Sequence, residues 1–173
     1  MLIVDCDCGD CRLPILKAGN WELEAAVKSV FNPRDHLELQ DRVQRLRAEQ
    51  KPQWGKMSAV QMVAHLSDSL RMASGELEVP PKKVLFRYSP LKELVLYLLP
   101  MPKGLPTSPE LIARKPGDWS EEVADLRDQL NGIVQRGAEA LSPTHPAFGK
   151  LSAKQWGVLI YRHVDHHLRQ FGV

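Results

Sequence analysis

The sequence lacks the features that define membrane-spanning and all-β proteins. Its longest apolar run, Leu94 to Leu99, is far shorter than the roughly 20 residues that a spanning helix needs. Runs in which β-branched and aromatic residues alternate with polar ones are absent, apart from a weak strand candidate at Lys83 to Tyr88. We therefore expect an all-α protein without a membrane span.

Cysteine is scarce, and neither sign of charge dominates. Cys6, Cys8 and Cys11 lie within six residues, so they cannot link distant parts of the fold, and without a fourth cysteine they are a weak zinc motif. The 23 Lys and Arg nearly balance the 21 Asp and Glu, and the basic residues are scattered. Nucleic acid and anionic membranes are therefore poor partners. The acidic N-terminus is unlike a secretion signal, and we expect a cytoplasmic protein.

The chain has the length and composition of a single globular domain. Of its 173 residues, 43% are hydrophobic and 25% charged. Residues 1–31 show no clear period apart from a short helix expected at Trp21 to Phe31, so we interpret them as an N-terminal extension that carries the cysteine cluster. Residues 32–173 form the predicted domain.

Capping signals and helical periodicity predict four long helices. The first runs from Pro33 to Glu49 behind an Asn32 cap. The second follows a capping box at Ser58 to Gln61 and ends near Gly75. The third begins at Trp119 to Glu122 with serine as its cap and ends near Leu141, and the fourth follows a capping box at Ser152 to Gln155, with Gly172 after its end.

The segment between the second and third helices is rich in proline. Residues 76–118 hold eight of the 13 prolines, so no long helix or central strand can persist there, and we interpret them as a crossover. One short apolar helix, Leu91 to Leu99, is expected to pack over the domain as a lid or plug.

An internal repeat refines the fold prediction. Residues 54–61 and 148–155 agree at five of eight positions, so the second and fourth helices begin alike. If each is the second arm of a helical hairpin, two hairpins joined by the Pro-rich crossover make a four-helix bundle. An apolar hairpin face also makes a homodimer an expected assembly.

Three histidines mark the candidate site. His163 and His167 are one helical turn apart on an otherwise apolar face, so both imidazoles can reach one cation; His166, at i+3, is the competing partner. His65 lies beside the apolar stripe of the second helix and can complete the set. Three imidazoles suit a divalent transition metal such as zinc, nickel, iron or copper, with one coordination position left open.

Three neighbours of the candidate ligands could orient a ligand or substrate, namely Asp68, His166 and Gln170. Asp68 lies one turn after His65, and Gln170 lies one turn after His167. The sequence names no catalytic residue. A plainer explanation also stays open, because histidine near a helix C-terminus gains from the helix dipole.

Other residues give weaker signals. Ser67 and Ser69 lie near His65 without the G-x-S-x-G turn of serine nucleophiles. We interpret His36 and His145 as surface or loop residues. Three tryptophans at helix starts are expected to anchor packing, namely Trp54, Trp119 and Trp156.

Three segments together suggest a family. The chain resembles the DinB-like superfamily and, within it, a bacterial family of uncharacterised function, in the segments Trp54 to Leu66, His145 to Leu151 and His163 to Gly172. The likeness covers about residues 30–173. The resemblance implies a four-helix bundle that carries one metal on three histidines, which here would be His65, His163 and His167. Members of this superfamily include metal-dependent transferases and isomerases that use low-molecular-weight thiols such as bacillithiol, mycothiol or glutathione, so the resemblance implies an activity of this kind.

These observations lead to three functional hypotheses. The first is a metal-dependent enzyme acting on a small molecule, of the thiol-dependent transferase or hydrolase type. The second is a metal- or ligand-binding module without turnover. The third is a helical interaction protein without metal.

Overall fold

The structure, a computed structural model, describes residues 27–104 and 106–173. Within these ranges it is mainly helical, as predicted, with one small two-stranded sheet. The four long helices are α2 (Pro33–Gln44), α3 (Ala59–Ser74), α5 (Trp119–Arg136) and α6 (Ala153–Gln170). The cysteine cluster and most of the short helix expected at Trp21 to Phe31 lie outside the described residues, and the described part of that helix, 27–31, is not helical.

The predicted capping boxes begin α3 and α6 as expected. In each helix the serine Oγ accepts the backbone N–H of the glutamine at 3.3 Å, and the glutamine Oε1 accepts the serine N–H at 2.9 Å. Gly75 ends α3 with a φ of +81°, a conformation that glycine adopts without strain. The two helices that carry the candidate ligands are therefore fixed by local sequence.

The other two long helices are shorter than predicted. The α2 helix ends at Gln44 and not at Glu49, because the N–H groups of Arg45 and Leu46 bond back only three residues and close the last turn. The α5 helix ends at Arg136 and not at Leu141, because Gly137 has a φ of +74°; a separate 3₁₀ turn, Ala138–Ala140, follows it. The N-cap of α5 is Asp118, so the serine predicted to cap it lies inside the first turn.

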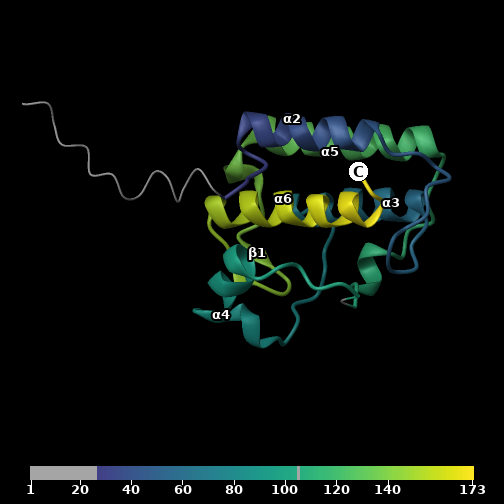
Figure 1. The fold of residues 1–173 in the computed structure, drawn as a ribbon. Coiled ribbons are helices and arrows are strands. Elements are labelled where there is room, and N and C mark those ends of the chain that lie inside the picture. Colours follow the sequence, from purple (N-terminus) through teal and green to yellow (C-terminus); the bar gives the residue numbers. More distant parts are fainter. Residues whose placement is uncertain (1–26, 105) are drawn as a thin grey trace, which may run out of the picture.

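The helices do not pair as the predicted hairpins. The α2 helix packs against α6 and α5, and α3 packs most extensively against α5 (Figure 1). The long connections before α3 and α6 explain this difference, because only a short loop forces consecutive helices to lie side by side.

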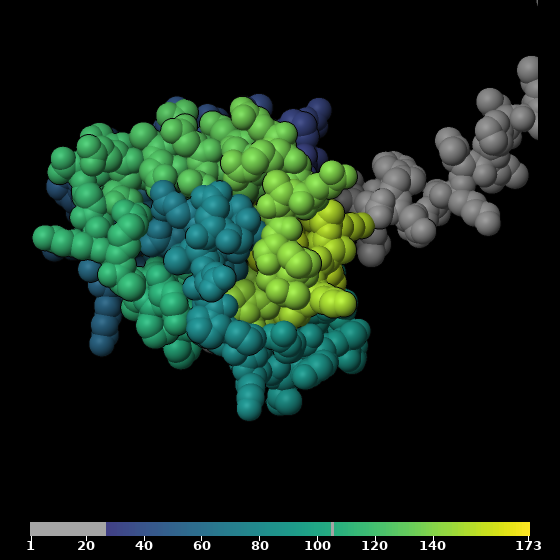
Figure 2. Space-filling view, turned by 180° about the vertical axis from the view of Figure 1, so that it is seen from behind, coloured from purple at the N-terminus to yellow at the C-terminus, as the bar shows by residue number. Residues whose placement is uncertain are grey.

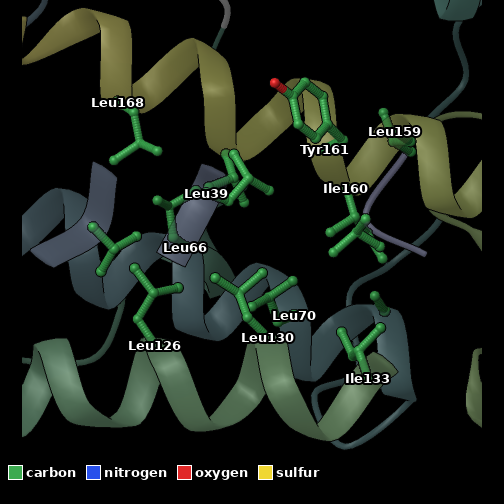
Figure 3. Close-up of a cluster of buried hydrophobic side chains, with 14 of the residues drawn as sticks. Leu39, Leu66, Leu70, Leu126, Leu130, Ile133, Leu159, Ile160, Tyr161 and Leu168 are labelled. Atoms are coloured by element: carbon green, nitrogen blue, oxygen red, sulfur yellow. The ribbon is translucent and has the colours of Figure 1, made fainter. Parts of the chain in front are cut away.

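Leucine and isoleucine side chains from all four long helices form the core. In Figure 3, residues of α6 such as Leu168 and Ile160 point toward Leu126 and Leu130 of α5, with Leu66 of α3 between them. These five side chains are at most 4% exposed. Burial of this interface fixes α3 and α6 relative to each other.

The crossover contains only short elements. The expected strand at Lys83 to Tyr88 is wrong, since Leu85–Arg87 is a 3₁₀ turn. Strands occur instead at β1 (Thr144–His145) and β2 (Gly149–Lys150), which pair antiparallel. The predicted helix at Leu91 to Leu99 forms as α4 (Leu91–Glu93) followed by a π-helical turn, Leu94–Leu98. Another 3₁₀ turn, Pro109–Leu111, precedes α5.

None of the helices in residues 27–104 and 106–173 is both long and apolar enough to cross a membrane.

Candidate metal centre

Three histidines from two helices converge at one point. One ring nitrogen each of His65 on α3 and of His163 and His167 on α6 lie within 4.8 Å of one another. The Nε2 atoms of His65 and His163 are 3.3 Å apart, and the three pairs of ring centroids are 4.9 to 5.2 Å apart. The spacing of one turn within α6 supplies two rings, and the packing of α3 supplies the third.

Hydrogen bonds fix the orientation of two of these rings. Nδ1–H of His65 donates to the backbone carbonyl of Leu111 at 3.2 Å, and Nδ1–H of His167 donates to Oε1 of Gln170 at 2.8 Å. Because both acceptors are oxygens without a proton, each ring has its hydrogen on Nδ1 and a lone pair on Nε2. Metal-binding histidines typically have this arrangement.

The amide of Gln170 is itself held in place. Its Nε2 donates to the backbone carbonyl of Trp54 at 2.6 Å, so Oε1 must face His167. The neighbouring Gly55 has a φ of +84°, and a Cβ added there would lie 2.5 Å from Nε2 of Gln170. A glycine at this position therefore permits the contact between Trp54 and Gln170.

Burial keeps the three rings neutral. It lowers the pKa of His65, and it lowers the pKa of His167 to about 3, with the nearby His65 adding to the effect. The pKa of His163 is held well below its ordinary value by burial and by the two neighbouring histidines. The helix-dipole explanation requires a protonated ring, so it does not account for this cluster.

The observed separation fits a metal ion. Two ligands at 2.0 to 2.1 Å from a tetrahedral zinc ion would be about 3.3 to 3.4 Å apart. The Nε2 atoms of His65 and His163 match this value at 3.3 Å. The triad could therefore hold a metal, and all three histidines line the adjoining cavity.

The other two orienting candidates, Asp68 and His166, form no hydrogen bond to the triad among the described residues. The carboxylate of Asp68 accepts hydrogen bonds from Arg71 at 2.9 Å and Arg114 at 3.2 Å, and no bond joins it to a histidine within the described segments. His166 stacks edge-on against Trp54, with ring centroids 5.7 Å apart, and lines the cavity. Of the three candidates only Gln170 hydrogen-bonds to a ligand ring, while the ring of His166 packs edge-on against that of His167, with centroids 5.3 Å apart.

A cavity of about 560 Å³ opens on the triad, and most of its wall is apolar. Lys103 lies over the ring of Trp54, with Nζ 4.1 Å from the centroid. The expected lid, Leu91 to Leu99, does not line this cavity. Residues 101, 102, 104, 106 and 107, which follow it in the chain, line the cavity instead. The apolar walls are contributed by Met57, Leu66, Leu70, Met101, Phe148, Leu159 and Ile160.

His145 is a cavity residue that the sequence did not reveal. It was expected to be a surface or loop residue, and it lies in β1, within the connection between α5 and α6. Its Nδ1 accepts the backbone N–H groups of Ala147 at 3.0 Å and Phe148 at 3.2 Å. Burial, with Lys82 and Arg87 nearby, lowers its pKa to about 4. The neutral ring must therefore carry its hydrogen on Nε2. The one sequence signal for an ordered loop here is the pair of turn-forming residues Pro146 and Gly149, which lie close together.

The remaining sequence candidates are structural. His36 was expected to be a surface or loop residue, but it lies within α2 and faces α5, where its Nε2 donates to Oδ1 of Asn131 at 2.9 Å. The hydroxyl of Ser69 donates to the carbonyl of His65 and so serves the helix. Trp156 is a packing anchor as predicted, and its Nε1 donates to the carbonyl of Ser142.

Comparison with known proteins corrects the family suggested by the sequence. A search of curated proteins and a search of solved structures found no match. A family model matches residues 31–172, and it is that of a distinct family and not of a DinB-like one, so the resemblance inferred from the histidine motifs was wrong as a family assignment. Short histidine motifs at helical spacing specify a site and do not specify a family. The chain belongs to the family described as "Protein of unknown function (DUF1569)".

Proposed function

We propose that this protein binds one divalent transition metal through His65, His163 and His167 and uses it to transform a small molecule. The observation that supports this proposal is the convergence of three neutral imidazoles whose ligand nitrogens lie within 4.8 Å. Borderline nitrogen ligands favour zinc, nickel or iron over magnesium or calcium.

The chemistry of the site would be hydrolysis or thiol transfer. A bound ion would supply Lewis acidity, which activates water or a thiol for attack on an electrophile. The chain's own residues have supporting roles: Leu111 and Gln170 orient two ligand rings, and the apolar cavity walls exclude bulk water. Assays with esters and with thiols plus an electrophile distinguish the two reactions.

The cavity indicates the class of substrate. Its volume of about 560 Å³ is in the range of small-molecule sites, and its walls are largely apolar. Polar groups are few, and one of them is the fixed Nε2–H of His145, a donor suited to a carbonyl or carboxylate oxygen. The substrate is therefore a small, mainly apolar molecule with an oxygen acceptor.

We also propose that the fold carrying the site is a four-helix bundle. The helices α2, α3, α5 and α6 share one core, and each packs against at least two of the others. Bundles commonly build metal sites from side chains on facing helices, as α3 and α6 would do here.

Metal analysis of protein purified without a histidine tag tests the proposal. We expect about one equivalent of metal per chain in the unmutated protein and in His36→Ala, because His36 bonds to Asn131 away from the triad. His65→Ala and His163→Ala should lose the metal. A substoichiometric content in the unmutated protein after incubation with zinc, nickel or iron would count against the proposal.

Turnover separates an enzyme from a binding module. The metal-loaded protein is assayed with a panel of apolar esters and with thiols plus an apolar electrophile, against the metal-free protein. A rate that depends on the metal supports catalysis. Full metal binding without a metal-dependent rate would instead identify a module that captures a ligand in the cavity.

A further inference from the structure

A cluster of exposed apolar side chains lies in the crossover. Among the described residues, six of the eight exposed large hydrophobic side chains fall within residues 85–99, and we call these six the apolar patch: Leu85, Tyr88, Leu91, Leu94, Leu98 and Leu99. Leu85 and Leu98 are 80% and 75% exposed. Such a concentration on a folded protein typically marks an interaction surface.

The patch belongs to an anchored segment. Leu96 points inward and is 1% exposed, while Leu91, Leu94 and Leu98 follow one face of the short helix and point outward. The guanidinium of Arg162 on α6 donates to the backbone carbonyls of Val95, Leu96 and Leu99. These bonds hold the last turn of the segment against α6, so the leucines are presented to solvent by ordered structure.

The patch lies at one end of the molecule. In Figure 1 the segment around α4 is the element farthest from α2 and α5, and in Figure 2 the same teal segment forms the lower edge of the surface. It can therefore meet a broad, flat partner without interference from the long helices.

The segment that carries the patch is rich in basic residues. Residues 82–103 contain five Lys and Arg against one acidic residue, Glu93, a net charge of +4, whereas the whole chain carries only +2. Lys92 donates to the carbonyl of Lys150, which brings β2 and its lysine to the same edge. This segment thus combines exposed leucines with a local excess of positive charge. The expectation against anionic membranes rested on the charge balance of the whole chain, which does not describe this segment.

We propose that the apolar patch docks this protein onto an anionic lipid surface. Leucine and tyrosine side chains enter the boundary between headgroups and acyl chains, and the lysines contact the lipid phosphates and carboxylates. A second copy of the chain fits less well, because a two-fold contact through the same patch would place two segments of net charge +4 face to face.

The docking surface continues to the mouth of the cavity. Met101 and Pro102 follow the patch within three residues and line the cavity that opens on the histidines. Docking would therefore bring the cavity rim close to the lipid, where apolar substrates accumulate. The docking itself needs no metal, so its failure leaves the proposed function untouched.

Vesicle sedimentation tests this proposal with the full chain. We expect binding to vesicles of equal parts phosphatidylcholine and phosphatidylserine, and at least about tenfold weaker binding to phosphatidylcholine alone or in high salt. The double variant Leu85→Ser/Leu98→Ser should lose at least about tenfold in binding to the anionic vesicles. The control is Leu37→Ser/Ile112→Ser, which changes two residues that are 62% and 54% exposed outside the patch and should bind normally.

Two outcomes would overturn the proposal. One is equal vesicle binding by the two double variants, with circular dichroism showing that both are folded. The other is found by light scattering without lipid: a dimeric unmutated protein and a monomeric Leu85→Ser/Leu98→Ser variant would assign the patch to a second copy of the chain.

Discussion

Gln170 accepts a hydrogen bond from Nδ1 of His167 at 2.8 Å while its own amide nitrogen donates to the carbonyl of Trp54 at 2.6 Å. One side chain thus connects a candidate metal ligand to the segment that leads into α3. Because the donor and acceptor ends of the amide are both engaged, the ring of His167 is held with its Nε2 lone pair toward the other two histidines.

Replacing Gln170 by leucine should weaken metal binding and leave the fold intact. The ring of His167 would lose its acceptor, and the affinity for zinc should fall about 10- to 100-fold in competition titrations with a chromogenic chelator. Gln44→Leu, at the exposed end of α2, is the matched control and should bind zinc normally. Equal affinities in the two variants would show that Gln170 does not position the ring.

Gly55→Ala should disturb the same contact from the other side. The added Cβ would lie 2.5 Å from Nε2 of Gln170, whereas a Cβ at Gly75 meets nothing within 4 Å. Both glycines have positive φ, so both variants lose a similar amount of stability, about 1 kcal/mol. Only Gly55→Ala should also lose zinc affinity, measured by the same titration; a parallel loss in Gly75→Ala would assign the effect to backbone strain.

Arg114→Met should destabilise the fold by about 3 kcal/mol in urea unfolding. Arg114 pairs with two acids whose side chains are nearly buried, Asp68 and Glu122, which are 7% and 4% exposed, and the variant would leave them without this cation. Arg136→Met removes an exposed ion pair to Glu76 and should lower the free energy of unfolding by less than about 1 kcal/mol, because surface ion pairs contribute little to stability. A cost for Arg114→Met as small as that of Arg136→Met would contradict this account.

The stability of the metal-free protein should fall as the pH falls from about 6.5 to about 4. Burial lowers the pKa of His145 from 6.5 to about 4, so in this range the unfolded chain binds a proton that the folded chain does not. The stability associated with the neutral ring is therefore complete above pH 6.5 and is lost on acidification. His145→Asn, which retains an acceptor for the N–H groups of Ala147 and Phe148, should reduce the slope of the free energy of unfolding against pH. An unchanged slope would show that His145 is protonated in the folded state.

Local sequence signals predicted the elements that carry the site. The capping boxes at Ser58 and Ser152 form as expected, because a cap is a contact between residues three apart and needs no tertiary partner. The ends of α2 and α5 were predicted less well. Apolar residues such as Leu46 and Leu141 continue the helical spacing past each end, although the backbone has already left the helix.

The sequence by itself determined the mainly helical class, the starts of α3 and α6, and the pairing of His163 with His167 on one helix face, because each depends on periodicity within a few turns. Only the tertiary structure decided which helices pack together, brought Nε2 of His65 to within 3.3 Å of Nε2 of His163, and placed His145 beside the cavity. These relationships join residues far apart in the chain, and they are set by how the apolar faces of the helices pack.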